Sequence, residues 1–267
     1  MVSEIRYASL DGARLGYQVH SEGSGKPNAI FAHGYSGRST DMKAYEAILR
    51  DLAEEFTVYA LDLRGHGASA SEVEGWSIEA STDDIAAFAT QLGLIGALYI
   101  GHSFGGFTGM YCEARHPGTF SALCLITPGA AGNSGRLDPA SGAVMIEHGK
   151  DHDFLMGVFA ASYKDIAAAV SHVDAIVEMD SLVHATFFPS FSKLNVLDQL
   201  AKVEIPVLLL AGAQDSVIQL STLHETALAF PNCKEVVFTT EGHAMPIDSP
   251  DLTASEIVAF WKNNVRR

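Results

Sequence analysis

The sequence predicts an α/β fold in which helices flank a mostly parallel sheet of eight strands, with a helical insertion above the sheet. Apolar runs of strand length alternate along the chain with segments whose apolar residues recur at helical spacing. Such alternation favours a parallel sheet with helices on both faces. It stops after residue 128 and resumes near residue 199, so the stretch between is predicted to be an insertion.

Length and composition favour one core domain. A chain of 267 residues could hold two ordinary domains, but α/β folds of this size are commonly one. We therefore expect a core of residues 1–128 and 199–267, and a helical segment of residues 129–198 that we call the cap. With 48% hydrophobic and 18% charged residues, the chain has the composition of a folded globular enzyme rather than a disordered protein.

The charge balance argues against polyanionic partners. Acidic residues number 32 and basic residues 17, which gives a formal net charge of −15. Binding to nucleic acid or to an anionic membrane depends on clustered Lys and Arg. We expect neither partner, and expect a small molecule instead.

Cysteine usage and hydropathy indicate where the protein resides. Cys112, Cys124 and Cys233 are widely spaced and cannot all pair, which favours buried thiols in a reducing compartment. No stretch has about 18 uninterrupted apolar residues, and charged residues interrupt the N-terminal segment, so neither a membrane span nor a signal peptide is predicted. We expect a cytoplasmic monomer or homodimer.

The first half of the chain predicts six strands. Residues 4–10 and 14–20 alternate polar and apolar positions around the turn dipeptide Asp11-Gly12, which indicates an antiparallel hairpin. Short apolar runs predict the next four strands at 28–32, 56–61, 98–101 and 121–126. Helical spacing predicts three helices. The first covers residues 41–55, and the third runs from about residue 104 to residue 115. The second begins after Ser81 or Thr82, which would be its N-cap residue, and ends at about residue 94.

The second half begins with the cap, which shows helical patterns without strands. Strand patterns return at 205–210 and 234–238, separated by a helix that ends near residue 230. An amphipathic helix over 252–261 closes the chain.

The stretch 98–106 is the strongest functional signal. A strand ends in Gly101, Ser103 follows two residues later, and Gly105 follows two after that. Glycines at these positions permit a sharp turn that lifts the serine hydroxyl from the sheet edge, the geometry of a nucleophile elbow. Ser103 is therefore the candidate nucleophile.

Two further side chains follow predicted strands. Asp215 lies on the loop after strand 205–210, and His243 lies on the loop after the last strand. A serine nucleophile needs a base to accept its proton and an acid to orient that base. We predict that His243 is the base and Asp215 the acid, while Asp248 is a weaker candidate for the acid because it could cap the last helix.

Five motifs together resemble the α/β-hydrolase superfamily over most of the core: His33-Gly34-Tyr35, 62–69, 101–106, 212–215 and 242–243. The nucleophile, acid and base also follow the chain order of that superfamily. The resemblance implies that the backbone N–H groups of Tyr35 and Phe104 form an oxyanion hole, and that the reaction needs neither a cofactor nor a metal.

Candidate substrate-binding residues come from the motifs and from the cap. They are His33, Gly34, His102, Phe159 and Phe187. For His33, as for His66, we expect a structural role in bracing a backbone turn more than contact with the substrate. The many apolar side chains of the cap suggest a substrate with a hydrophobic acyl or alcohol part.

These features predict a serine hydrolase of the carboxylesterase type, which cleaves carboxylic esters or lactones through an acyl-enzyme. A carbon–carbon bond hydrolase acting on a diketone, an amide or thioester hydrolase, and an acyltransferase would use the same triad, so fold analogy leaves them open. Two remoter alternatives are a non-catalytic ligand receptor and a cofactor-free oxygenase.

Overall fold

A computed structural model describes residues 4–40, 43–70, 73–130 and 139–265. The eight-stranded sheet has the order β1-β2-β4-β3-β5-β6-β7-β8. Strands β1 and β2 form the predicted hairpin, β2 also pairs antiparallel with β4, and all other neighbours are parallel. The strands are β1 Arg6–Leu10, β2 Ala13–His20, β3 Asn28–Ala32, β4 Thr57–Leu61, β5 Ala97–His102, β6 Phe120–Ile126, β7 Val207–Gly212 and β8 Cys233–Phe238. The predicted α/β fold with a mostly parallel sheet is confirmed.

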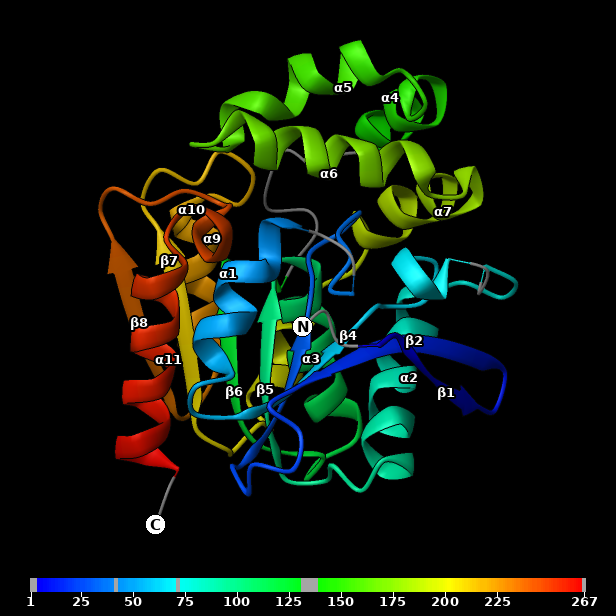
Figure 1. The fold of residues 1–267 in the computed structure, drawn as a ribbon. Coiled ribbons are helices and arrows are strands. Elements are labelled where there is room, and N and C mark those ends of the chain that lie inside the picture. The colour runs from blue at the N-terminus through cyan, green and yellow to red at the C-terminus, as the bar shows by residue number, and fades with distance from the viewer. Residues whose placement is uncertain (1–3, 41–42, 71–72, 131–138, 266–267) are drawn as a thin grey trace.

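Helices cover both faces of the sheet (Figure 1). One face carries α1 Lys43–Leu52, α10 Met245–Asp248 and α11 Pro250–Asn264. The other carries α2 Ile78–Gln91, α3 Phe104–Arg115, α8 Leu197–Leu200 and α9 Leu220–Ala229. In the described part of the chain, no helix is long and apolar enough to cross a membrane. The cytoplasmic location and the oligomeric state stay predictions.

The alternation of side chains along the strands builds the two halves of the core. Leu98 and Ile100 of β5 are fully buried against the α1 and α11 side, whereas Tyr99 between them is fully buried against α2 and α3. A strand buried on both faces must be apolar at consecutive positions. This explains why β5 reads as a continuous apolar run rather than an alternating one.

The start of α2 differs from the prediction. Ser77 is the N-cap residue of α2, because its backbone is extended and its hydroxyl oxygen accepts the N–H of Ala80 at 3.0 Å. Ser81 and Thr82, which we expected to cap, lie buried inside the helix, and the Thr82 hydroxyl donates to the Ile78 carbonyl. Helix α1 also ends earlier than predicted, and residues 41–42 at its expected start lie outside the described residues.

Between β6 and β7 the described chain is helical, with no strand. It forms α4 Pro139–His148, α5 His152–Phe159, α6 Ile166–Glu178 and α7 Ser181–Phe191, together with one short 3-10 turn at Ala160–Ser162. These helices lie together above the carboxyl ends of the parallel strands (Figure 1). The limits of the cap and its separation from the core stay a prediction, and residues 131–138 lie outside the described part.

Gly109 tests how closely α3 packs on β5. A Cβ at this position would lie 2.0 Å from the ring of Tyr99, so Gly109→Ala should lower the free energy of unfolding by about 1–3 kcal/mol through overpacking. Gly157 of α5 is the matched control, because a Cβ there meets open space among the described residues. Gly157→Ala should raise the free energy of unfolding by up to about 1 kcal/mol. Urea denaturation measures both, and equal effects would contradict this packing.

Candidate active site

Ser103 occupies the turn between β5 and α3. Its φ of +50° lies in the left-handed region, which costs a non-glycine residue about 1–3 kcal/mol and is typical of functional turns. The turn is tight on both sides. A Cβ at Gly101 would lie 2.4 Å from the carbonyl oxygen of Gly105, and a Cβ at Gly105 would lie 2.4 Å from that of Ala32. The glycines are needed because the backbone segments approach closely.

Ser103, His243 and Asp215 form a continuous hydrogen-bonded chain. His243 Nε2 lies 2.9 Å from Ser103 Oγ, and His243 Nδ1 lies 2.9 Å from Asp215 Oδ2. The other oxygen of Asp215 accepts the backbone N–H groups of Val217 and Ile218. An ionised carboxylate only accepts, so Nδ1 of His243 donates to it and Nε2 is left to accept from the serine. This arrangement can remove a proton from the hydroxyl.

The weaker candidate acid lies elsewhere. Asp248 Oδ1 accepts the backbone N–H of Lys164 in the cap at 3.1 Å, and burial raises the pKa of this carboxyl. Of the two acids, Asp215 is the one in contact with His243. The structure therefore favours Asp215, although the catalytic roles themselves stay predictions.

His102 links three loops around the serine. Its Nε2 donates to the backbone carbonyl of His243 at 2.9 Å, and its Nδ1 accepts the hydroxyl of Tyr45 at 2.6 Å. The Tyr45 oxygen in turn accepts the N–H of Gly34. Burial lowers the pKa of His102 well below its usual range, which keeps the imidazole neutral and able both to donate and to accept.

Phe104 and Tyr35, whose backbone N–H groups are the predicted oxyanion donors, line the same cavity as Ser103. Phe104 is the first residue of α3, so its N–H has no acceptor within the helix. Tyr35 follows Gly34 on the loop after β3. Within the described ranges, neither N–H donates a hydrogen bond to another protein group. Both are available for a ligand oxygen, as the predicted oxyanion hole requires.

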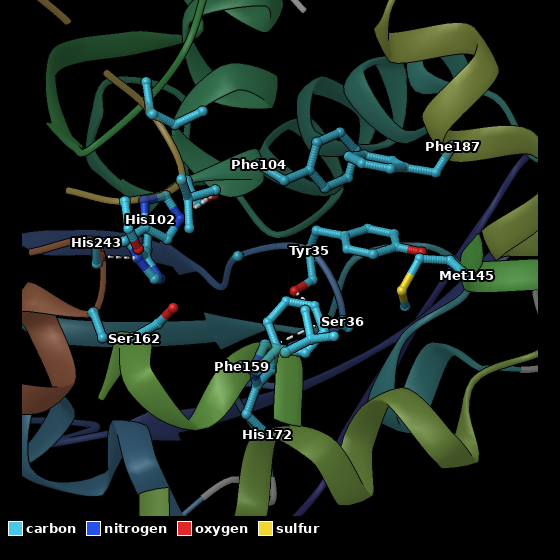
Figure 2. A pocket seen from close by; sticks show the side chains of 18 of the residues that line it. Tyr35, Ser36, His102, Phe104, Met145, Phe159, Ser162, His172, Phe187 and His243 are labelled. Carbon is cyan, nitrogen blue, oxygen red and sulfur yellow. Dashed lines mark hydrogen bonds between the residues drawn. The ribbon is translucent and has the colours of Figure 1, made fainter. Parts of the chain in front are cut away.

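A cavity of about 530 Å³ opens at Ser103, a size that suits a small organic molecule. Figure 2 shows His102 and His243 at one end and Phe104, Phe187 and Met145 towards the other. Most lining side chains are apolar. The lining residues are Gly34, Tyr35, Ser36, Gly37, Tyr45, His102, Ser103, Phe104, Gly129, Val144, Met145, Phe154, Val158, Phe159, Ser162, Tyr163, His172, Phe187, Phe188, Phe191, Ser216, Val217, Ile218, His243 and Ala244.

Of the candidate substrate-binding residues, Gly34, His102, Phe159 and Phe187 line this cavity, and His33 does not. His33 is fully buried; its Nδ1 donates to the Gly34 carbonyl at 2.7 Å and its Nε2 accepts the N–H of Leu63 at 3.1 Å. With both nitrogens engaged by backbone, His33 braces two loops and has no atom left for a substrate.

Sequence reasoning missed several lining residues. Ser36 directly follows the His33-Gly34-Tyr35 motif, so its position in the sequence could have indicated it. Tyr45 lies on a helix where it counts as one more apolar residue, and His172 lies on a cap helix without any local motif. Only the folded chain brings the last two to the cavity.

The described residues contain no group of three or more metal-ligating side chains. The run Asp151-His152-Asp153 contains three side-chain types that can bind a metal, but the first two have partners within the protein. Asp151 caps α5 by accepting the N–H of Phe154, and His152 lies 3.4 Å from Asp174 of α6.

The buried histidines make stability depend on pH. Burial lowers the pKa of His33 and His172 to about 4 and that of His66 to about 3. Between about pH 6.5 and pH 4, such imidazoles take up protons only in the unfolded chain, so the free energy of unfolding falls as the pH drops, by about 1.4 kcal/mol per proton and pH unit. Burial raises the pKa of Asp62 to about 6, so this carboxyl takes up a proton first in the folded chain and increases the free energy of unfolding as the pH drops. One such group cancels the effect of only one of the histidines.

We therefore expect the melting temperature to fall steadily between pH 7 and pH 5, which calorimetry would measure. A melting temperature that stays level or rises over this range would contradict the neutral, buried state of these imidazoles.

Comparison with known proteins identifies the family to which the sequence is similar. The alpha/beta hydrolase family model matches residues 29–256. The bifunctional esterase/perhydrolase of Acinetobacter calcoaceticus is 26% identical in an alignment that covers 89% of this chain and 92% of that protein. The 3-oxoadipate enol-lactonase 2 of Acinetobacter baylyi is 25% identical, with 72% of this chain and 73% of that protein covered.

Solved structures show the same fold. The enol-lactonase from Burkholderia xenovorans superposes with a TM-score of 0.81 at 20% identity, and the match covers 97% of this chain and 100% of that one. At this identity the likeness is one of fold.

Proposed function

The chain belongs to the alpha/beta hydrolase family, and we propose that it hydrolyses carboxylic esters or lactones through an acyl-enzyme formed on Ser103. The observation that carries the proposal is the chain of two 2.9 Å contacts from Ser103 through His243 to Asp215. A serine hydroxyl aligned with a base that a buried carboxylate orients is the arrangement that acyl transfer requires.

In the proposed first step, Ser103 Oγ attacks the carbonyl carbon of the substrate while His243 Nε2 takes the hydroxyl proton. The carbonyl oxygen becomes an oxyanion, which the N–H groups of Tyr35 and Phe104 stabilise. The intermediate collapses, the bond to the leaving oxygen breaks, and His243 returns the proton to that oxygen. The product is an alcohol and an ester on Ser103; for a lactone, the two remain one molecule.

In the second step, water attacks the acyl-enzyme, and His243 takes one of its protons. The new oxyanion uses the same two N–H groups. Its collapse breaks the bond to Ser103 Oγ, which recovers a proton from His243, and a carboxylic acid leaves. No group outside the chain, the substrate and water is needed for the balance of atoms and charge.

The cavity and the relatives favour an ester or lactone with a hydrophobic part. Aromatic side chains such as Phe104, Phe187 and Phe191 line much of the cavity and are buried. They would hold an alkyl or aryl group by excluding water from it. Relatives named as a bifunctional esterase/perhydrolase and as an enol-lactonase support this bond type. The same triad could also cleave amides, thioesters and diketones.

Replacement of the nucleophile tests the mechanism. With a short-chain p-nitrophenyl ester, Ser103→Ala should lower kcat by at least about 10⁴-fold, because it removes the atom that forms the acyl-enzyme. Circular dichroism and the melting temperature serve as controls for folding. Residual hydrolysis within a few-fold of the parent would rule out Ser103 as the nucleophile.

Two aspartates near His243 provide a matched pair. Asp215→Asn should lower kcat by about 10⁴-fold, because an amide no longer holds the imidazole in the required tautomer. Asp248→Asn should change kcat by no more than about threefold, because Asp248 contacts a backbone N–H of the cap rather than the base. A larger loss at Asp248 than at Asp215 would reverse the assignment. Steady-state kinetics of both variants gives the comparison.

A further inference from the structure

Two consecutive residues after β3 are hydrogen-bonded to histidines of the cap. The hydroxyl of Tyr35 lies 2.5 Å from Nδ1 of His184 on α7, and the hydroxyl of Ser36 lies 2.8 Å from Nε2 of His172 on α6. We call residues 33–38 the β3 loop. This loop carries the Tyr35 N–H that the proposed function assigns to the oxyanion hole. Two different cap helices thus make hydrogen bonds to this loop.

The hydrogen-bond pattern fixes the tautomer of each imidazole. Nε2 of His184 faces the carbonyl oxygen of Ile176 at 3.3 Å and donates to it, so Nδ1 accepts from Tyr35. The Ser36 hydroxyl donates to the Tyr35 carbonyl at 2.6 Å, so its oxygen must accept from Nε2 of His172. Burial lowers the pKa of both imidazoles and keeps them neutral, so Nδ1 of His184 retains the lone pair that accepts the Tyr35 hydroxyl.

Packing and backbone conformation make the loop dependent on these contacts. The Tyr35 ring stacks on Phe187 of α7, with ring centroids 3.9 Å apart, so the direction of its hydroxyl is fixed. Ser36 has a φ of +58°, a conformation that a serine adopts only when its surroundings hold it there. Arg38, at the end of the loop, is paired with Glu178 of α6. Figure 2 shows the Tyr35 side chain directed away from His243, towards Met145, and Ser36 on the side of His172.

We propose that His184 and His172 are positioning residues of the cap, which hold the β3 loop so that the Tyr35 N–H points at the developing oxyanion. The proposal rests on the proposed function and deepens it, because it makes the cap a part of the oxyanion hole as well as a wall of the cavity. An oxyanion donor must be placed closely, and a misplacement of 1 Å can cost about 100-fold in rate. Hydrogen bonds from two helices supply that placement.

The first test removes the phenol hydroxyl alone. Tyr35→Phe retains the backbone N–H and the aromatic ring that stacks on Phe187, and His184→Leu removes the acceptor from the other side. Each should lower the single-turnover acylation rate with p-nitrophenyl butyrate by about 10-fold to 100-fold, with KM changed by less than about twofold. Because both variants break the same hydrogen bond, the double variant should be no more than about twofold slower than the slower single variant.

The second test asks whether an asparagine at position 184 restores the hydrogen bond that a leucine there removes. The side-chain oxygen of an asparagine lies close to where Nδ1 of a histidine would be, and it accepts a hydrogen bond. His184→Asn should therefore keep acylation within about threefold of the parent while His184→Leu does not. The matched control is His152→Gln, which removes a histidine whose neighbour Asp174, 3.4 Å away, lies within the cap. It should leave acylation unchanged within about twofold.

The outcomes separate the alternatives. If Tyr35→Phe and His184→Leu lower the melting temperature but leave the acylation rate within twofold of the parent, the contacts only attach the cap to the core and the proposal is wrong. Multiplying effects in the double variant, or equal losses in His184→Asn and His184→Leu, would also overturn it. Failure of the proposed function is a different result, namely full activity in Ser103→Ala.

Discussion

The close backbone approach at the serine turn is the constraint on which the rest of the structure depends. Helix α3 starts so near β3 and β5 that only glycine fits at positions 101 and 105, where a Cβ would lie 2.4 Å from a carbonyl oxygen. This contact brings the Ser103 hydroxyl, the first N–H of α3 and the β3 loop to one point at the edge of the sheet. A side chain at either glycine would force these groups apart, and every proposed catalytic interaction would lose its geometry.

Neutral imidazoles hold the loops around that point. His102 joins Tyr45 to the carbonyl of His243, His33 joins the loops after β3 and β4, and His184 joins the β3 loop to the cap. A neutral imidazole offers one donor and one acceptor on opposite sides, so it can bridge two loops that a charged one, with two donors, could not. Burial, which lowers the pKa of these side chains, is therefore a requirement of the network.

Sequence reasoning reached the sheet, the cap helices and the three candidate catalytic side chains because each leaves a local signal, either a period of apolar residues or a place directly after a strand. It did not reach Tyr45 or His184, whose partners lie 57 and 149 residues away in the chain. No local pattern shows which histidine of an amphipathic helix turns inward. The start of α2 shows the same limit at short range, since Ser77 and Ser81 are the same residue type and only the folded backbone, extended at Ser77, shows which one is the N-cap.

The central claim is that Ser103 is the one activated nucleophile in the cavity, and covalent labelling tests it most directly. The protein would be incubated with a fluorophosphonate, digested, and its peptides sequenced by mass spectrometry. The account predicts one adduct per chain, on Ser103, and its loss in His243→Gln. The absence of any adduct, or an adduct on one of the other serines that line the cavity, Ser36, Ser162 or Ser216, would contradict it.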